Sequence, residues 1–277
     1  SEPRPVRGVE NEIAVLVDVN GCSVYAYTGG RAFDATRPSI IFVHGACNDH
    51  SVWALQSRYF AHHGSNVFAV DTPGHGRSSG DARNSVAGIA DWLAALLDAL
   101  AIERAALVGH SLGALAVLDM TARYPTRVSR IALLGPSAPM PVADVLLDAA
   151  KKNDHVAFEL INGWSLSAGH QLGGSEQPGI WMSGNALRLM ERSRPGALYN
   201  DLIACRDYGD GVKAAGSIRC PAWVMLAQRD LMAPPANATL LIEALADKRV
   251  VTVSSCGHSL MAEAPRAVLD GLREFLL

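Results

Sequence analysis

The segment GHSLG at positions 109–113 places a serine between two glycines. It ends a continuous apolar run over 105–110, which is typical of a buried strand, and leads into 112–124, which is typical of a helix. A G-x-S-x-G turn between a strand and a helix holds its serine at the carboxyl end of the sheet, and only small residues fit two positions before and after it. We therefore interpret Ser111 as a nucleophile, with an ordinary turn serine as the alternative.

A serine hydroxyl is a weak nucleophile, so it needs a base that is itself oriented by a carboxylate. His258 follows the last apolar run, and Asp230 follows the run before it. Because parallel strands end at one edge of a sheet, both side chains are expected beside Ser111. A catalytic serine held in such a strand-to-helix turn, called a nucleophile elbow, belongs to triads with the chain order Ser, Asp, His. We predict a triad of Ser111, His258 and Asp230; the alternative is a surface aspartate and a helix-capping histidine.

Acyl transfer also needs hydrogen-bond donors for the oxyanion that forms on the substrate. One candidate is Leu112 N–H, at the N-terminus of the helix after Ser111. The second is expected from the loop after the apolar run at 39–45, where Ala46 is the first residue after His-Gly. We predict the N–H groups of Ala46 and Leu112 as the oxyanion hole, and we expect His44 to shape this loop rather than to act as a base.

The elements that must position these residues alternate along the chain. Two alternating stretches near 14–18 and 23–27 are joined by Asn20-Gly21, a strong hairpin signal. Continuous apolar runs follow, as in strands covered by helices on both faces, and a helical repeat lies at 91–100. This alternation predicts an α/β fold with a mostly parallel sheet and a final helix. The apolar runs lie at 39–45, 66–71, 105–110, 130–135, 221–230 and 249–258.

The strand pattern stops after position 135 and returns at 221. We therefore predict a core in two parts, 1–136 and 216–277, interrupted by a helical cap insertion at 137–215.

Within the predicted insertion, Trp164, Trp181 and Met182 either line an apolar substrate pocket or pack the insertion on the core, and both interpretations stay open. A Gly-rich loop at 167–179 is expected to act as a mobile gate, because glycine adds backbone freedom.

The composition points to an ordinary globular protein with a large core. Of 277 residues, 49% are hydrophobic and 18% are charged. The net charge of −3, without blocks of like charge, gives no electrostatic reason to expect nucleic acid or a membrane as a partner. There is no signal-peptide pattern and no apolar run of transmembrane length, so we expect a cytoplasmic protein. The composition makes no prediction of oligomeric state.

No metal or cofactor is expected. The five cysteines are widely spaced, and free thiols are favoured over disulfides or metal ligands. Cys256 and His258 have no second ligand pair nearby, which argues against zinc. The sequence contains neither a P-loop nor a G-x-G-x-x-G turn.

Together, the segments FVHGACNDHSVW, DTPGHGRS, VGHSLG, QRD and GHS resemble the α/β-hydrolase superfamily over the whole chain. The resemblance implies a sheet of about eight strands, a triad at Ser111, His258 and Asp230, and a cap domain over the site. It also implies a structural role for His75 in DTPGHGRS. A serine nucleophile argues against haloalkane dehalogenases and most epoxide hydrolases. The HGACND loop differs from the HGGG loop of hormone-sensitive-lipase-like esterases, and lacks the G-P-G run of many proline iminopeptidases and C–C hydrolases.

Three hypotheses about function follow. The first is a serine hydrolase that cleaves a small to medium, partly apolar carboxylic ester through an acyl-enzyme, with water as the second substrate. The second is a C–C bond hydrolase, an amidase or a thioesterase on the same triad. The third is a ligand receptor that keeps the triad, because fold does not determine function.

Overall fold

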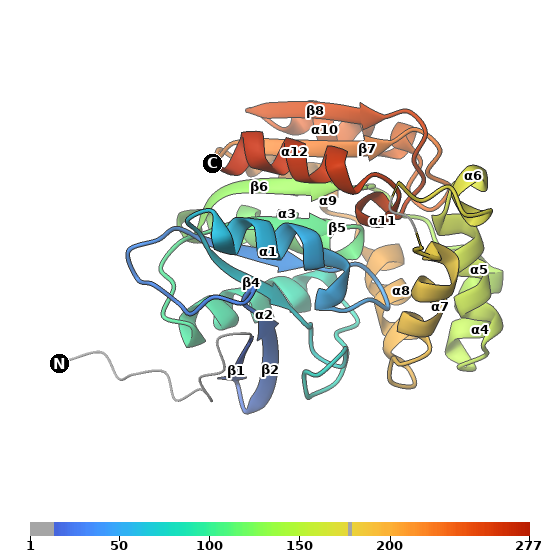
Figure 1. Ribbon diagram of the computed structural model, residues 1–277, viewed down its shortest axis with the longest axis horizontal. Coiled ribbons are helices and arrows are strands. Elements are labelled where there is room, and N and C mark those ends of the chain that lie inside the picture. Colours follow the sequence, from blue (N-terminus) through green and yellow to red (C-terminus); the bar gives the residue numbers. More distant parts are fainter. Residues whose placement is uncertain (1–13, 177–178) are drawn as a thin grey trace.

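The computed structural model describes residues 14–176 and 179–277, which form one eight-stranded sheet with helices around it (Figure 1). Positions 1–13 of the predicted core and positions 177–178 of the predicted Gly-rich loop lie outside the described residues. The strands are β1 Ala14–Val19, β2 Cys22–Tyr27, β3 Ser39–Val43, β4 Asn66–Val70, β5 Ala105–His110, β6 Val128–Leu134, β7 Ala222–Ala227 and β8 Lys248–Val253. The helices are α1 Ala54–His62, α2 Val86–Ala99, α3 Leu112–Arg123, α4 Asp144–Lys151, α5 Val156–Ser165, α6 Ala168–Gln171, α7 Met182–Met190, α8 Ala197–Asp207, α9 Gly211–Ser217, α10 Thr239–Ala244, α11 Leu260–Glu263 and α12 Pro265–Leu276.

The sheet is mostly parallel, with strand order β1-β2-β4-β3-β5-β6-β7-β8. β1 pairs antiparallel with β2, and β2 pairs antiparallel with β4, whereas the strands from β4 through β3 to β8 run parallel. Asn20 and Gly21 connect the β1–β2 hairpin with φ angles of 53° and 81°. Positive φ at both central residues is the geometry that an Asn-Gly hairpin turn requires. The expected α/β sheet of eight strands and its hairpin are confirmed.

Helices cover both faces of the sheet, which explains the continuous apolar runs. Helices α2, α3, α9 and α10 pack on one face, with buried residues such as Leu93 and Leu115. Helices α1, α11 and α12 pack on the other face, with Phe60, Leu260 and Leu272. Strands β3, β4, β5 and β7 are buried along their whole length, because neither face is open to water.

Between β6 and β7 the described chain is helical. Helices α4, α5, α7 and α8 share an apolar cluster, which includes Leu146, Ile161, Met190 and Leu198 and also Cys47 from the loop after β3. Figure 1 shows α4 to α8 beyond the ends of the parallel strands, on the side toward which the strand arrows point. Helix α9 instead packs beside α3 and α10 in the layer that flanks the sheet. Among the described helices, none has the length and apolar character needed to cross a membrane.

Candidate active site

Ser111 occupies a strained turn between β5 and α3. Its φ and ψ are 54° and −120°, a conformation that is uncommon for a residue with a side chain. Its N–H donates to Leu134 O at 2.9 Å, so the turn is tied to the end of the neighbouring strand β6. A Cβ on Gly109 would lie 2.3 Å from Gly113 O, and one on Gly113 would lie 2.4 Å from Val43 O. Both flanking positions therefore require glycine, as the motif predicts.

Gly113→Ala tests this packing. The added methyl group would overlap with backbone atoms of β3, so we expect the free energy of unfolding to fall by about 1–3 kcal/mol or more. Gly163→Ala in α5 is the matched control, because a Cβ there meets nothing within 4 Å. Denaturant unfolding of the two variants gives the comparison, and equal stability of both would contradict the close approach at Gly113.

Asp230 and His258 form a direct hydrogen bond at the ends of β7 and β8. His258 Nδ1–H donates to Asp230 Oδ2 at 2.7 Å, and both side chains are buried. Asp230 Oδ1 accepts from the N–H groups of Met232 and Ala233 at 2.9 and 2.7 Å. Burial alone would raise the pKa of Asp230, but His258 and the Ala233 N–H outweigh it, so its pKa lies below the usual value. An ionised carboxylate can only accept, which places the proton on Nδ1 and leaves Nε2 able to accept one.

His110 connects the elbow to the loop that carries His258. The two imidazole rings lie 4.7 Å apart, and His110 Nε2–H donates to His258 O at 2.9 Å. Burial lowers the pKa of His110 to about 3, so this ring is neutral. A Cβ on Gly135 would lie 3.4 Å from His258 Cε1 and 3.6 Å from Asp230 Oδ2, so the end of β6 is also in contact with this pair.

The structure gives Ser111 no hydrogen bond to His258 within the described chain. In unliganded active sites this bond is commonly long and shortens when substrate binds. The three predicted triad residues thus lie at one edge of the sheet, and the Asp–His hydrogen bond is the one already formed.

One predicted oxyanion donor belongs to Leu112, the residue after Ser111, and the other to Ala46 in the loop after β3. A Cβ on Gly45 would be 3.1 Å from Ser111 Cβ, so the loop after β3 contacts the serine directly. In the part of the chain that the structure describes, the N–H groups of Ala46 and Leu112 donate to no protein acceptor. Both donors are therefore available to a ligand.

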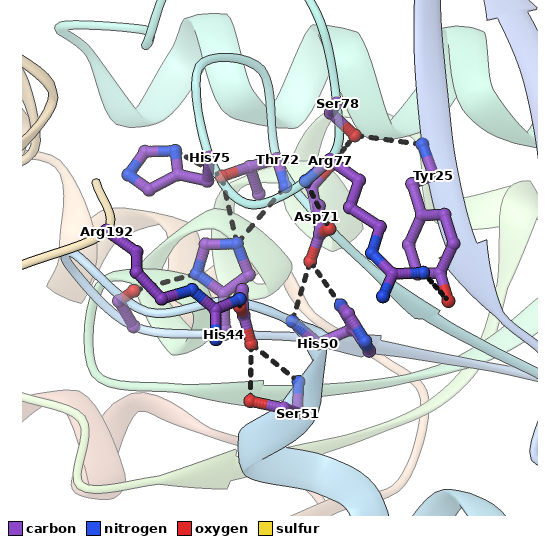
Figure 2. Close-up of polar contacts among 12 residues, drawn as sticks. Tyr25, His44, His50, Ser51, Asp71, Thr72, His75, Arg77, Ser78 and Arg192 are labelled. Atoms are coloured by element: carbon purple, nitrogen blue, oxygen red, sulfur yellow. Dashed lines mark hydrogen bonds and ion pairs between the residues drawn. The ribbon is translucent and has the colours of Figure 1, made fainter. Parts of the chain in front are cut away.

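A network of buried polar side chains supports the loop after β3 (Figure 2). Asp71 accepts from His50 N–H at 2.7 Å, from His50 Nδ1–H at 2.8 Å and from Arg77 N–H at 2.8 Å. His44, which was expected to shape this loop, donates through Nδ1–H to Gly45 O at 2.8 Å. Asp49, His50 and Asp71 bring three potential metal ligands within 4.8 Å of one another, but hydrogen bonds within the loops already engage their carboxylates.

Sequence reasoning missed two buried carboxylates. Asp201 on α8 contacts His75 and also Cys47, in the Gly45–Cys47 turn after β3, which we call the oxyanion loop. Glu263 on α11 accepts from Gly257 N–H at 3.1 Å and from Ser167 N–H at 3.0 Å, beside His258. Each looks like an ordinary helix-surface acid in the sequence, so no local signal could have identified it.

A cavity of about 500 Å³ lies beside His110 and Ser259, the neighbours of Ser111 and His258. Met182 lines it, whereas neither Trp164 nor Trp181 does. Trp164 packs partly buried against the apolar cluster of α4, α5, α7 and α8, and Trp181 is 68% exposed. The other residues around the cavity are apolar (Val52, Ile180, Ala186, Leu189, Met261 and Ala262) or polar (Asn48, Ser51, Asn185, Arg188 and Arg192).

A model of the alpha/beta hydrolase family matches residues 40–270. The chain belongs to this family. It is 29% identical over 237 residues to the pimeloyl-[acyl-carrier protein] methyl ester esterase of Aromatoleum aromaticum, a match that covers 80% of this chain and 92% of that protein. This alpha/beta hydrolase is also 36% identical over 123 residues to the dihydrolipoyllysine-residue acetyltransferase component of the acetoin cleaving system of Cupriavidus necator, over 44% of this chain and 31% of the other.

Solved structures confirm the alpha/beta hydrolase fold. The enol-lactonase from Burkholderia xenovorans superposes with a TM-score of 0.82 at 24% identity, over 93% of this chain and 98% of that one. Family membership and the esterase relative support a hydrolase activity.

Proposed function

We propose that this alpha/beta hydrolase cleaves small to medium, partly apolar carboxylic esters through an acyl-enzyme on Ser111. The observation that carries the proposal is the 2.7 Å hydrogen bond between His258 and Asp230 at the sheet edge where Ser111 occupies its strained turn. A serine, an oriented imidazole and free backbone donors are the parts that acyl transfer needs. The esterase named among the relatives agrees with this chemistry.

In the first half-reaction, Ser111 Oγ attacks the ester carbonyl carbon while His258 Nε2 takes the serine proton. The negative charge that develops on the carbonyl oxygen is stabilised by the N–H groups of Ala46 and Leu112. Collapse of the tetrahedral intermediate expels the alcohol, which receives the proton from His258. Asp230 keeps the imidazole in the tautomer that can accept and stabilises its charged form.

In the second half-reaction, water takes the place of the alcohol. His258 removes a proton from the water as it attacks the acyl-enzyme, and the acid is released when Ser111 recovers its proton. His258 thus takes up one proton in each half-reaction and returns it, first to the departing alcohol and then to Ser111.

We further propose that the predicted insertion 137–215, apart from the start of helix α9, acts as a cap over this site. Support comes from the position of α4 to α8 beyond the strand ends, and from the residues that α7 contributes to the cavity. Apolar side chains such as Met182 and Leu189 suit an acyl chain or an alcohol of moderate size. A cytoplasmic location, also proposed, agrees with the five free cysteines.

The experiment that tests the bond type is a substrate panel at matched concentrations: p-nitrophenyl esters of graded chain length, a thioester, an anilide and a C–C bond substrate. We expect ester hydrolysis to have the highest kcat/KM and a fluorophosphonate probe to label Ser111. A higher kcat/KM for one of the other bonds would replace the ester proposal with that hydrolase class. Labelling of Ser111 without turnover of any substrate would favour the hypothesis of a ligand receptor that keeps the triad.

Met182→Ala should change the chain-length preference. Met182 is buried and lines the cavity, so its truncation lengthens the space available to a substrate chain. One apolar contact is worth roughly 1–3 kcal/mol of discrimination, or about 10- to 200-fold in relative kcat/KM. Met190→Ala is the matched control on the same helix, because Met190 is equally buried but packs in the cluster of α4, α5, α7 and α8. We expect that variant to lose stability and to keep its preference; the same profile in both variants would rule out the assigned pocket.

A further inference from the structure

Asp201 links helix α8 to the loop that carries the predicted oxyanion donor. Its side chain is buried, and Oδ2 accepts from two groups of the core: Cys47 N–H at 2.8 Å and His75 Nε2–H at 2.9 Å. Cys47 directly follows Ala46 in the chain. A helix between β6 and β7 thus contributes a charged group that contacts the oxyanion loop itself.

A directed chain of hydrogen bonds continues from Asp201 to the other side of this loop. His75 Nδ1 lies 3.0 Å from Thr72 Oγ1 and 3.0 Å from Pro73 O. Thr72 N–H donates to His44 Nε2 at 3.1 Å, and Figure 2 shows Thr72 between the two imidazoles. A nitrogen that accepts from an amide carries no proton, so the His44 proton is on Nδ1, which donates to Gly45 O.

The pKa shifts of His75 and His44 agree with this direction of the hydrogen bonds. Burial alone would lower the pKa of His75, but the charge of Asp201 and the hydrogen bond to it raise the pKa above its usual value. Burial and the neighbouring His75 lower the pKa of His44, which keeps that ring neutral. Asp201 and His75 therefore make a buried pair in direct contact, and His44 acts as a neutral donor to the loop.

These contacts hold the oxyanion loop on both sides of the predicted donor. Gly45 C=O and Ala46 N–H belong to one peptide unit, so the bond from His44 to Gly45 O sets the direction in which Ala46 N–H points. The next N–H in the chain, that of Cys47, is held by Asp201. Cys47 has a φ of 56°, and a residue with a side chain keeps such a conformation only where its surroundings impose it.

We propose that Asp201 is a positioning residue for the oxyanion hole, holding the Gly45–Cys47 turn so that Ala46 N–H points at the developing negative charge. This inference rests on the proposed acyl-transfer function. It makes helix α8 a part of the catalytic apparatus, in addition to its place in the proposed cap.

The test is a comparison of Asp201→Ala and Asp201→Asn with the wild-type enzyme on its best p-nitrophenyl ester. Loss of one oxyanion donor costs about 10²–10³ in kcat, and a displaced donor costs less. We expect Asp201→Ala to lower kcat about 10- to 100-fold with KM changed less than about threefold, because the oxyanion exists only after attack. Asp201→Asn keeps an oxygen that accepts from Cys47 N–H, so it should recover part of the loss. Asp207→Ala, at an exposed acid of the same helix, is the matched control and should have wild-type kcat.

A second measurement separates positioning from a purely structural role. An alkylboronic acid forms a tetrahedral adduct on Ser111 and places an oxygen in the oxyanion hole, whereas the carboxylate product binds without that adduct. We expect Asp201→Ala to weaken boronic acid binding by the same factor as kcat and to leave product binding unchanged. If Asp201→Ala does not fold, the same comparison is made with Asp201→Asn, for which we expect a smaller loss in the same two quantities.

The results that would overturn this inference about Asp201 differ from those that would overturn the proposed acyl-transfer function. Wild-type kcat and boronic acid affinity in the folded Asp201 variants would overturn the inference, and so would equal losses of boronic acid and product binding. If a fluorophosphonate labels Ser111 in the wild type and turnover depends on Ser111, the acyl-transfer function stands even when this inference fails.

Discussion

Ser111→Ala is expected to lower kcat by a factor of 10³ or more, because no other group can form the acyl-enzyme at this position. The hydroxyl makes no hydrogen bond within the described chain, so its removal leaves no protein donor or acceptor unpaired. The strained φ of 54° remains, since alanine has the same backbone restrictions as serine. We therefore expect the thermal unfolding midpoint to change little and substrate to bind still.

Initial rates on the p-nitrophenyl ester panel and a melting curve of the same preparation check this expectation. Ser129→Ala is the matched control, a serine in strand β6 that lies outside the site. Wild-type turnover in the Ser111 variant would contradict the nucleophile assignment. If the variant instead unfolds at a much lower temperature than the wild type, its loss of turnover has a structural cause. Fluorophosphonate labelling of the wild type then locates the nucleophile.

Asp230→Asn is expected to lower kcat by about 10³–10⁴ through a change of tautomer. Oδ1 of Asp230 accepts from the N–H groups of Met232 and Ala233, so an asparagine would place its carbonyl oxygen there and direct its NH₂ at His258. The amide would then donate to Nδ1 and leave the imidazole proton on Nε2, where it blocks proton transfer from Ser111.

The matched control is Asp119→Asn, another largely buried carboxylate, which lies on α3 and accepts from Tyr208 and Arg123. We expect this variant to lose some stability and to keep its kcat. The measurement is kcat for both variants at saturating substrate, and an undiminished kcat in Asp230→Asn would exclude the proposed role of the carboxylate.

The strand pattern and the elbow were predictable because their signals are local. Each apolar run at 39–45, 66–71 and 105–110 contains a buried strand. Gly109 and Gly113, which are four positions apart in the sequence, lie in direct contact. The proximity of Asp230 and His258 followed from one topological rule, that parallel strands end at a common edge.

What the sequence could not reveal depends on contacts between distant residues. Helix α1 buries Gln56 and Ser57, so its apolar pattern is broken and its bounds do not follow from the sequence. The directions of Trp164 and Trp181 are set by the packing of the helices between β6 and β7, which composition does not report. Asp201 meets Cys47 across 154 positions of sequence, and nothing near it indicates burial.

The long helical segment between β6 and β7 has a further consequence for how the chain folds. Strand β7 pairs with β6 only after positions 135–221 have been synthesised and folded back. Closing so long a loop costs entropy before any pairing is gained, although this cost grows only slowly with length, by about 0.6 kcal/mol per doubling. During that interval β6, an apolar strand, is an open edge of the sheet that can pair with another chain. Most contacts of the cluster formed by α4, α5, α7 and α8 are local in sequence, so we expect them to form early and to shorten the interval in which this edge is open.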